Sequence, residues 1–441
     1  MKNNYLPTDY QTFIATSRYA RWLDNEGRRE TWGETVERYI ENIVKPLLDD
    51  SNSNGHNAEI DLIRHHMLSL QVMPSMRSMM TAGKASMRDN TCMYNCSYLP
   101  VDDPKSFDEA MFILLCGTGV GFSVERQFIG KLPDVPTLFD SDTTVVIKDS
   151  KEGWAKGLRQ VLALLWAGEI PKWDISKVRA AGARLKTFGG RASGPAPLID
   201  LFNFTVTTFK GASGRKLSSI ECHDLMCKIG EVVVVGGVRR SAMISLSNLS
   251  DDRMRHAKSG NWWQNAAHRA LANNSVSYSE KPDSIAFMRE WTALMESGSG
   301  ERGIFNREAS IKQAAKNGRR ETCYEFGTNP CSEIILRPNQ FCNLSEVVVR
   351  ATDALEDVAR KVRIATILGT IQSTYTHFPY LRKVWQTNTA AERLLGVSLT
   401  GIMDNPLMTT ANNGLADTLE YLKDVAVSTN AEWADRLGIP V

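Results

Sequence analysis

Three side chains that could do chemistry together lie within five residues of the chain: Asn329, Cys331 and Glu333. If residues 329–336 are extended, the two-residue period of side chains along a strand places all three on one face. The set would combine an amide that donates and accepts hydrogen bonds, a redox-capable thiol and a carboxylate that accepts a proton. A structural strand rarely needs all three, so the pattern favours a reactive site.

The other cysteines set the chemical context of this site. The chain has eight cysteines in 441 residues, which is too sparse for a disulfide scaffold. A single cysteine is most simply a small buried apolar side chain. Cys222, His223 and Cys227, or Cys92 with Cys96, could suggest zinc, but no second ligand pair completes either set, so we expect no metal site. A thiol oxidoreductase is disfavoured because no Cys-x-x-Cys motif occurs.

The composition excludes several classes of function. Hydrophobic residues make up 42% of the chain and charged residues 23%, and the net charge is only +2, so nothing demands a nucleic acid or a membrane surface as partner. Apolar runs such as residues 161–167 and 232–238 are far shorter than the roughly 20 residues of a membrane-spanning helix. The first residues do not resemble a secretory signal. We therefore expect no nucleic-acid or membrane partner and a cytoplasmic location.

The elements that must position the reactive residues alternate between helix and strand. Thr31 and Glu34 predict a capping box before a helix that ends near Leu48. Further helices are predicted at residues 59–70, 106–115, 151–167, 217–235, 351–375, 381–395 and 418–437. Strands are predicted at residues 91–99, 242–246 and 396–402, near 119–124 and 276, and on both sides of a turn at 337–340. Strands separated by helices indicate the α/β class with parallel neighbours.

Two glycine-rich segments could meet a ligand. Gly117, Gly119 and Gly121 lie between a helix and a strand, the reverse of the order in the dinucleotide fingerprint. Substrate contact at these glycines and simple backbone packing remain open alternatives. Residues 184–195 add basic side chains and a serine that could gather phosphate oxygens, with a mobile surface loop as the alternative.

Several ordered segments of the chain together resemble the catalytic subunit of ribonucleotide reductase, most closely the monomeric adenosylcobalamin-dependent class II enzymes that act on ribonucleoside triphosphates. The resemblance implies a ten-stranded α/β barrel with a central finger loop near residues 327–345. The matching segments occur in the order of the family, at residues 73–78, 185–195, 236–242, 272–276, 303–307, 329–333, 340–347 and 396–402.

The resemblance also implies roles for individual residues. Cys331 is similar to the cysteine that carries a thiyl radical and takes the 3′ hydrogen of the ribose. Glu333 corresponds to the base for the 3′ hydroxyl, and Asn329 to the amide that holds the ribose hydroxyls. Cys96 and Cys342 correspond to the pair that supplies two electrons and becomes a disulfide.

The same resemblance suggests binding residues, a cofactor and partners. Adenosylcobalamin is the expected radical source, with a separate radical-generating subunit of class I type as the alternative. The expected ligands and partners are a ribonucleotide substrate, a deoxynucleotide effector and a thioredoxin-like reductant. The candidate substrate-binding residues are Ser75, Gly117, Gly119 and Gly121. The candidate effector-loop residues are Ser247, Asp251, Asp252, Arg269, Asn273 and Asn274.

The organisation expected from the resemblance is an N-terminal helical region, residues 1–70, followed by a partial catalytic barrel, residues 71–441. No Pro-Ser-Gly-Thr phosphate loop occurs, so the last barrel strands are expected to be missing and a strand edge to be left open. A split reductase that assembles with a C-terminal fragment is one interpretation. A catalytically incomplete nucleotide-binding or assembly module is the alternative.

Overall fold

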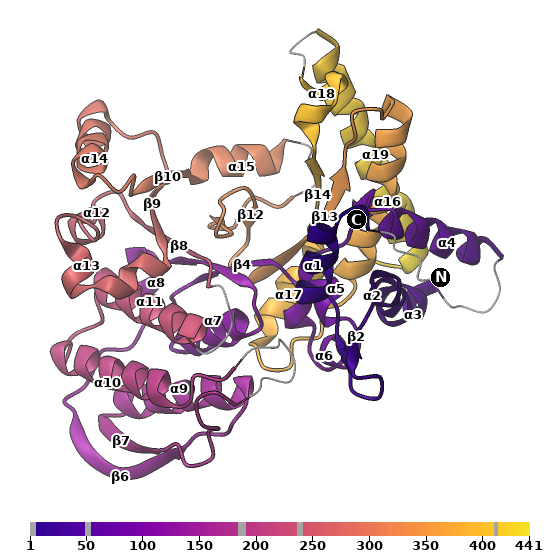
Figure 1. Cartoon of the computed structure of the whole chain (residues 1–441). Helices are drawn as coiled ribbons and strands as arrows, with labels where there is room; N and C mark the ends of the chain where they lie inside the picture. Colours follow the sequence, from indigo (N-terminus) through magenta and orange to yellow (C-terminus); the bar gives the residue numbers. More distant parts are fainter. Residues whose placement is uncertain are drawn as a thin grey trace. The chain divides into compact units, whose positions relative to one another are not determined.

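The structure is a computed structural model that describes residues 6–48, 54–183, 191–235, 241–316, 318, 320–409 and 413–441 (Figure 1). Most of the basic glycine-rich segment, residues 184–190, and the segment 236–240 lie outside the described residues. The chain forms two compact units. Unit 1 comprises Met1–Asn95, Phe341–Pro379 and Lys383–Val441, and unit 2 comprises Cys96–Gln340 and Tyr380–Arg382.

Unit 2 is built on a parallel sheet with the strand order β10-β9-β8-β5-β4. Its strands are β4 (Cys96–Pro100), β5 (Gly119–Ser123), β8 (Met243–Asn248), β9 (Asn273–Tyr278) and β10 (Gly303–Asn306). Because parallel neighbours need crossover connections, helices separate successive strands. The predicted α/β class with parallel neighbours is confirmed.

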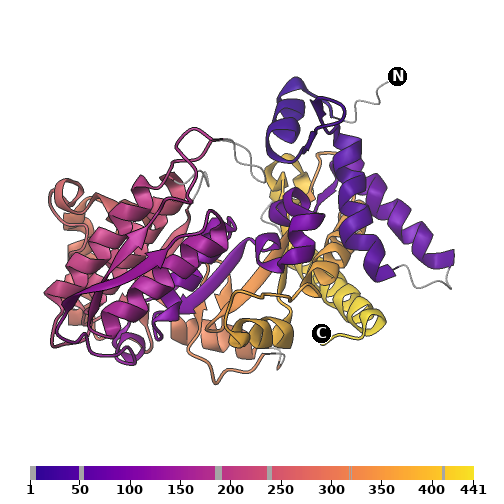
Figure 2. The same ribbon diagram turned by 90° about the horizontal axis from the view of Figure 1, so that it is seen from below.

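Layers of helices cover one face of this sheet (Figure 1). Helices α7 (Lys105–Leu115) and α11 (Ser219–Val235) pack on the strands, and α9 (Lys151–Trp166) and α10 (Ala196–Gly211) pack on those two helices. Beyond α9 lies a second, two-stranded parallel sheet, seen from below in Figure 2. Its strands are β6 (Phe139–Val146) and β7 (Glu169–Asp174).

Every residue of α7 after Lys105 is buried, because the helix lies between the sheet and α9. Two of its buried residues are acidic, and both are paired. Asp108 Oδ2 accepts hydrogen bonds from Arg159 Nε on α9 at 2.9 Å and from the Tyr380 hydroxyl at 2.7 Å. Burial nevertheless raises the pKa of Asp108 to about 6, against the lowering effect of Arg159. Glu109 pairs with Arg382 at 2.9 Å.

The rest of unit 2 consists of short elements around the sheet. Helices α14 and α15 flank β10 in sequence, and α12, α13 and a 3-10 turn connect β8 to β9. The bounds are α8 (Arg126–Ile129), α12 (Asp252–Arg255), α13 (Trp262–Asn265), η3 (Ala267–Leu271), α14 (Ser284–Ser297), α15 (Arg307–Ala315), β11 (Gly327–Thr328) and β12 (Ile335–Leu336).

Unit 1 combines helices with two groups of strands: β13 pairs parallel with β14 and antiparallel with β3, and β1 pairs antiparallel with β2. The strands are β1 (Trp22–Leu23), β2 (Arg28–Arg29), β3 (Val72–Met73), β13 (Gln340–Val348) and β14 (Leu395–Thr400). The helices are α1 (Asp9–Arg18), α2 (Trp32–Tyr39), η1 (Ile40–Val44), α3 (Lys45–Leu48), α4 (Asn54–Leu68), α5 (Met76–Thr81), α6 (Lys84–Arg88), η2 (Asn90–Met93), α16 (Leu355–Ser373), α17 (Lys383–Glu392), η4 (Ile402–Asp404), α18 (Pro406–Thr409) and α19 (Asn413–Leu437).

Local sequence signals account for much of unit 1. The capping box predicted at Thr31 and Glu34 is present, and both of its hydrogen bonds form. The predicted strand at residues 91–99 is wrong in its first half. Asp89 caps a 3-10 turn by accepting from the Thr91 amide at 2.8 Å, and the strand begins only at Cys96.

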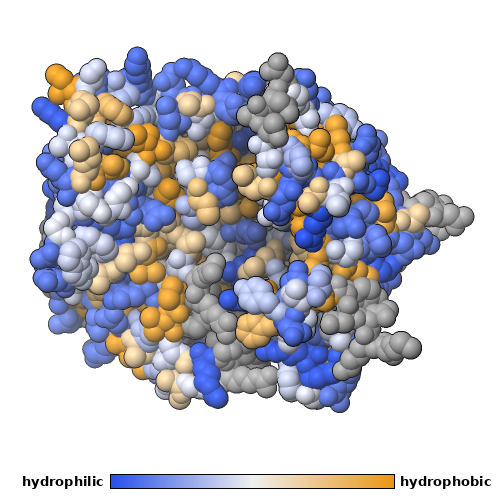
Figure 3. All heavy atoms as spheres, turned by 45° about the horizontal axis from the view of Figure 1, so that its top comes forward, coloured by the Kyte–Doolittle hydropathy of each residue, from blue (hydrophilic) through white to orange (hydrophobic). Residues whose placement is uncertain are grey.

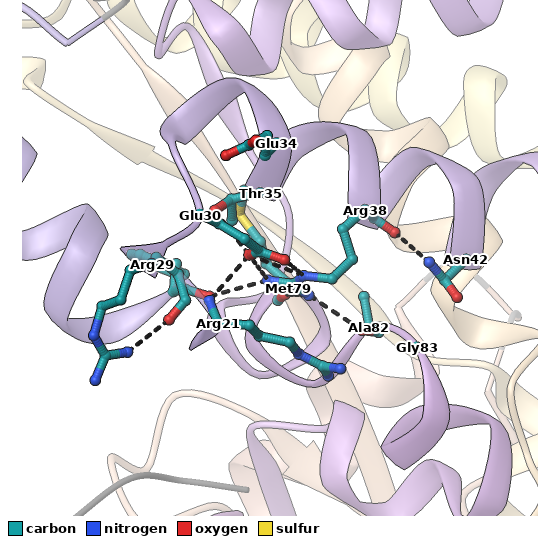
Figure 4. A network of polar contacts seen from close by, with 12 residues as sticks. Arg21, Arg29, Glu30, Glu34, Thr35, Arg38, Asn42, Met79, Ala82 and Gly83 are labelled. Carbon is teal, nitrogen blue, oxygen red and sulfur yellow. Dashed lines mark hydrogen bonds and ion pairs between the residues drawn. The ribbon is translucent and has the colours of Figure 1, made fainter. Parts of the chain in front are cut away.

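A buried ion pair joins four segments of unit 1 (Figure 4). Arg38 on α2 pairs with Glu30 at 2.9 Å, and both side chains are nearly excluded from solvent. The guanidinium also donates to the carbonyl oxygens of Tyr19, Met79 and Ala82 at 2.9–3.1 Å. A planar group with five N–H donors can satisfy all these acceptors at once, which a lysine could not do. The pair therefore holds together the residue after α1, the residues before α2, the end of α2 and the C-terminal end of α5.

Hydrophilic residues cover much of the face in Figure 3, with apolar residues interspersed. Within the described ranges, no helix is both long enough and apolar enough to cross a membrane.

Candidate functional site

Cys331 lies in a tight loop of unit 2 that is closed by a short hairpin. Strands β11 and β12 pair antiparallel, with Gly327 opposite Leu336 and Thr328 opposite Ile335. The six residues between them, Asn329–Ile334, form what we call the Cys331 loop.

The expectation that residues 329–336 are extended is wrong. Ser332 adopts a left-handed backbone conformation with φ +68°, and its amide donates to the Asn329 carbonyl oxygen at 2.9 Å. The chain therefore turns at Pro330–Ser332 instead of running as a strand, so a two-residue alternation cannot place the side chains. Asn329 is fully buried, whereas Cys331 and Glu333 are exposed.

The Asn329 side chain stabilises the Cys331 loop from inside. Its side-chain oxygen accepts from the Ile334 amide at 3.0 Å, which ties the two ends of the loop together. Its side-chain nitrogen donates to the sulfur of Cys96 on β4 at 3.4 Å. The structure therefore brings Asn329 and Cys96 into direct contact.

The Cys331 thiol is exposed to solvent but close to other acidic groups. Partial burial raises its pKa above the ordinary value, and the charges of Glu333 and Cys96 raise it further. A raised pKa keeps the sulfur as a protonated thiol near neutral pH. Because thiolates and not thiols are the nucleophiles, this environment disfavours nucleophilic chemistry at Cys331.

The hairpin packs on β4 and β5 through positions without a side chain. A Cβ atom on Gly121 of β5 would lie 1.8 Å from the carbonyl oxygen of Thr328, and a Cβ on Gly327 would lie 2.1 Å from the Tyr98 ring. Phe122, the next residue of β5, faces the opposite side of the sheet and packs near His223 of α11. The Cys331 loop thus lies on the face of the sheet away from α11.

This geometry assigns a packing role to one member of the glycine motif. Gly121 leaves room for the backbone of β11. Gly119 lies opposite Cys96 in the β4–β5 register, and its carbonyl oxygen accepts from the Ser97 hydroxyl at 2.8 Å. Gly117 adopts a positive φ of +86° after α7. Contact of these glycines with a substrate stays a prediction.

Two predicted site residues belong to unit 1. Cys342 is buried on β13, and the Cys96–Cys342 pair stays a prediction because the two residues lie in different units. Ser75 is buried at the N-terminus of α5, where its hydroxyl donates to the Asn95 side-chain oxygen at 2.9 Å.

The residues of the first predicted effector loop lie at the end of β8. Ser247 is buried on the strand and accepts from Arg302 at 3.0 Å. Asp251 caps α12 by accepting from the Met254 amide at 3.1 Å, and Asp252 begins that helix.

The second predicted effector loop is ordered secondary structure. Arg269 lies in the 3-10 turn η3, and Asn273 and Asn274 begin β9. Arg269 makes a bidentate pair with Asp224 of α11 at 2.7 Å, and the Asn274 side-chain oxygen lies 2.9 Å from His223. A nucleotide would have to exchange these internal contacts to bind here.

Reasoning from the sequence missed two residues next to the hairpin. Glu125 and Arg307 form a buried ion pair at 2.5 Å, and Arg307 also contacts the residue that precedes β11. The residues are 182 positions apart, so no local pattern could have paired them.

One segment of unit 2 matches a known protein family. Residues 134–207, which hold β6, α9, β7 and most of α10, match the family model described as the insertion domain of B12-dependent ribonucleotide reductase. Sequence reasoning predicted α9 but did not identify this domain.

Two relatives match most of the chain. Over 88% of its length, the chain is 28% identical to the adenosylcobalamin-dependent ribonucleoside-triphosphate reductases of Lacticaseibacillus paracasei and Lactobacillus delbrueckii subsp. bulgaricus. It spans 60% of the length of each.

Solved structures show the same relationship at the level of the fold. A crystal structure of a B12-dependent, class II ribonucleotide reductase matches with a TM-score of 0.78 at 23% identity, covering 97% of this chain and 71% of that one. The α subunit of the Actinobacillus ureae class Id enzyme matches with a TM-score of 0.54 at 12% identity, covering 99% and 69%. The chain is therefore a homologue of the adenosylcobalamin-dependent ribonucleoside-triphosphate reductases and has the fold of the class II ribonucleotide reductase.

Proposed function

We propose that this chain carries the reactive cysteine of a class II ribonucleotide reductase and takes part in reducing ribonucleoside triphosphates to 2′-deoxyribonucleotides. The Cys331 loop is the observation that carries the proposal. It presents an exposed thiol, kept protonated by its raised pKa, beside Glu333 and near Cys96. A protonated thiol is a poor nucleophile, but it holds the hydrogen atom that radical chemistry removes.

The residues divide the reaction between them. Once its own hydrogen atom has been removed, Cys331 takes the 3′ hydrogen of the ribose as a thiyl radical and returns it at the end of the turnover. Glu333 accepts the proton of the 3′ hydroxyl and gives it back. Asn329 holds the ribose hydroxyls, exchanging its contact with the Cys96 sulfur for the substrate. Cys96 and Cys342 give up two electrons and two protons and become a disulfide. The 2′ hydroxyl leaves as water and a hydrogen replaces it, so atoms and electrons balance.

Adenosylcobalamin is the cofactor that we assign to this site. When bound, it supplies the radical that a side chain cannot generate alone. The exposure of Cys331 fits an external radical source, because such a source must reach the sulfur. A separate radical-generating subunit is the weaker alternative, since the fold is less similar to the class Id α subunit than to the class II enzyme.

The proposal includes further ligands and partners. A deoxynucleotide effector would bind near the end of β8 and the start of β9. A thioredoxin-like dithiol would reduce the Cys96–Cys342 disulfide after each turnover. A C-terminal reductase fragment is a further proposed partner. We place the reaction in the cytoplasm, where cysteines stay reduced.

A second candidate function is nucleotide binding or assembly without turnover. The chain spans 60% of the length of those relatives, so turnover by the chain is itself the property to be tested. The two candidates differ in whether any combination of chains yields a deoxynucleotide.

The test is an assay of the purified chain with adenosylcobalamin, a dithiol and each ribonucleoside triphosphate, alone and with a polypeptide that carries the remaining part of a class II reductase. We expect deoxynucleotide in at least one combination, and none when Cys331→Ala replaces the wild type. Binding of a deoxynucleotide without turnover in every combination would favour the module instead.

A further inference from the structure

A buried charged pair contacts the stem of the Cys331 loop, by which we mean Phe326 and the two residues of β11. Arg307 is the first residue of α15, and Glu125 follows β5. The two side chains are almost completely buried and meet through two hydrogen bonds, Nη1 to Oε1 at 2.8 Å and Nη2 to Oε2 at 2.5 Å. The Ser123 hydroxyl donates a further bond to Glu125 at 2.8 Å. Both charges are therefore matched inside the protein.

The guanidinium also reaches the hairpin, besides a weaker bond from Nη1 to the Ser279 hydroxyl at 3.4 Å. Arg307 Nε donates to the carbonyl oxygen of Phe326 at 2.7 Å, and Phe326 immediately precedes β11. A planar guanidinium held by two bonds to Glu125 has little freedom to rotate, so its third bond fixes the Phe326 carbonyl in space.

Contacts on the next two residues leave the stem little freedom. Gly327 lies against the Tyr98 ring, and the Thr328 carbonyl lies against Gly121. Phe326, Gly327 and Thr328 are thus each held by a different group, and Cys331 follows three residues later. A stem fixed in this way limits where the thiol can lie.

We propose that Arg307 and Glu125 are positioning residues that hold the stem of the Cys331 loop and so set the environment of the Cys331 thiol. The effect of this positioning on turnover rests on the proposed function. Its effect on the pKa of the Cys331 thiol does not. Release of the stem should let Cys331 move away from its partly buried site, so its pKa should fall toward the ordinary value.

The experiment follows alkylation of individual cysteines by iodoacetamide across pH 6.5–10, quantified by mass spectrometry of peptides from the full chain. The test variant is Arg307→Lys, which keeps the charge but loses the two-pronged bond to Glu125 and the third donor. Glu125→Gln is a second, milder variant, which keeps the shape of the acceptor. Cys323, the other exposed cysteine, reports reagent activity, and the buried Cys222 reports unfolding.

The matched control is Arg302→Lys in the same unit. Arg302 forms an equally buried pair with Glu290 at 2.5 Å and also donates to backbone carbonyls, but these belong to Asn248 and Leu249 and not to the hairpin. Both arginine variants should lower thermal stability. A change in Cys331 alkylation that comes only from lower stability should therefore appear in both.

We expect Arg307→Lys to lower the alkylation pKa of Cys331 and so to raise its alkylation rate near neutral pH severalfold. Glu125→Gln should shift it in the same direction by less, and Arg302→Lys should leave it at the wild-type value. An unchanged Cys331 profile in Arg307→Lys, or an equal shift in Arg302→Lys, would overturn the proposal.

Turnover separates this inference from the proposed function. Where the assembled enzyme reduces nucleotides, Arg307→Lys should lower kcat at least about tenfold and leave KM nearly unchanged, because the Arg307 side chain is almost completely buried. If no combination of chains shows turnover, the proposed function fails, while the alkylation profile still decides the positioning role.

Discussion

Gly121 should not tolerate even one methyl group, because the backbone of β11 occupies the space of its missing side chain. An added Cβ would lie 1.8 Å from the Thr328 carbonyl oxygen and 2.9 Å from the carbonyl carbon, both of which are backbone atoms. The hairpin would have to move by more than about 1 Å to restore van der Waals contact. Overpacking of this kind costs typically 1–3 kcal/mol, and a clash with backbone belongs at about 3 kcal/mol.

The assay for Gly121→Ala is thermal unfolding together with alkylation of Cys331. A loss of about 3 kcal/mol corresponds to a fall in Tm of about 6–12 °C for a domain of this size. Cys331 should become more reactive, because the displaced hairpin carries the loop with it. The control is Gly211→Ala at the end of α10, where an added Cβ meets no atom within 4 Å and the helix gains propensity.

A clear result would refute this reasoning. If Gly121→Ala melts within about 1 °C of the wild type and Cys331 alkylates at the wild-type rate, then the hairpin does not depend on the bare glycine. The packing role of Gly121 would then be wrong, and substrate contact would be the remaining interpretation.

Three further predictions concern the same units. Gly327→Ala should cost about 1–3 kcal/mol in urea unfolding, because its Cβ would enter the Tyr98 ring, and Tyr98→Ala in the same chain should recover part of the loss. Arg38→Met should cost about 3–5 kcal/mol, since it leaves Glu30 buried without its main cation, and an unchanged Tm would contradict this. Burial raises the pKa of Asp108 from 3.8 to about 6, so the folded protein keeps this proton over a pH range in which the unfolded chain has lost it. The contribution of this proton to the free energy of unfolding is present below about pH 4 and lost by about pH 6. Between pH 4 and pH 6 the free energy of unfolding should fall by about 3 kcal/mol more in the wild-type protein than in Asp108→Asn.

Local signals in the sequence predicted the elements that local physics controls. The capping box at Thr31 satisfies helix N–H groups with residues three positions apart, so it could be recognised without the fold. The helices at α7, α9 and α11 followed from apolar periodicity, and the alternation of helices with strands gave the parallel sheet.

The features that the sequence did not reveal depend on distant residues. The turn in the Cys331 loop needs a positive φ at Ser332, which serine rarely adopts, and Asn329 stabilises it from inside the fold. Two contacts join segments that are far apart in the sequence. One is the ion pair of Arg307 with Glu125, which lie 182 positions apart, and the other is the contact of Gly121 with Thr328. Such contacts arise from sheet topology, which side-chain spacing does not encode.

The most direct test of the account is turnover by cysteine variants in the assembled enzyme. With adenosylcobalamin, a dithiol and a ribonucleoside triphosphate, Cys331→Ala should form no deoxynucleotide, whereas Cys323→Ala, which removes the other exposed thiol, should keep the wild-type rate. Deoxynucleotide formation by Cys331→Ala at the wild-type rate would contradict the claim that Cys331 is the reactive cysteine.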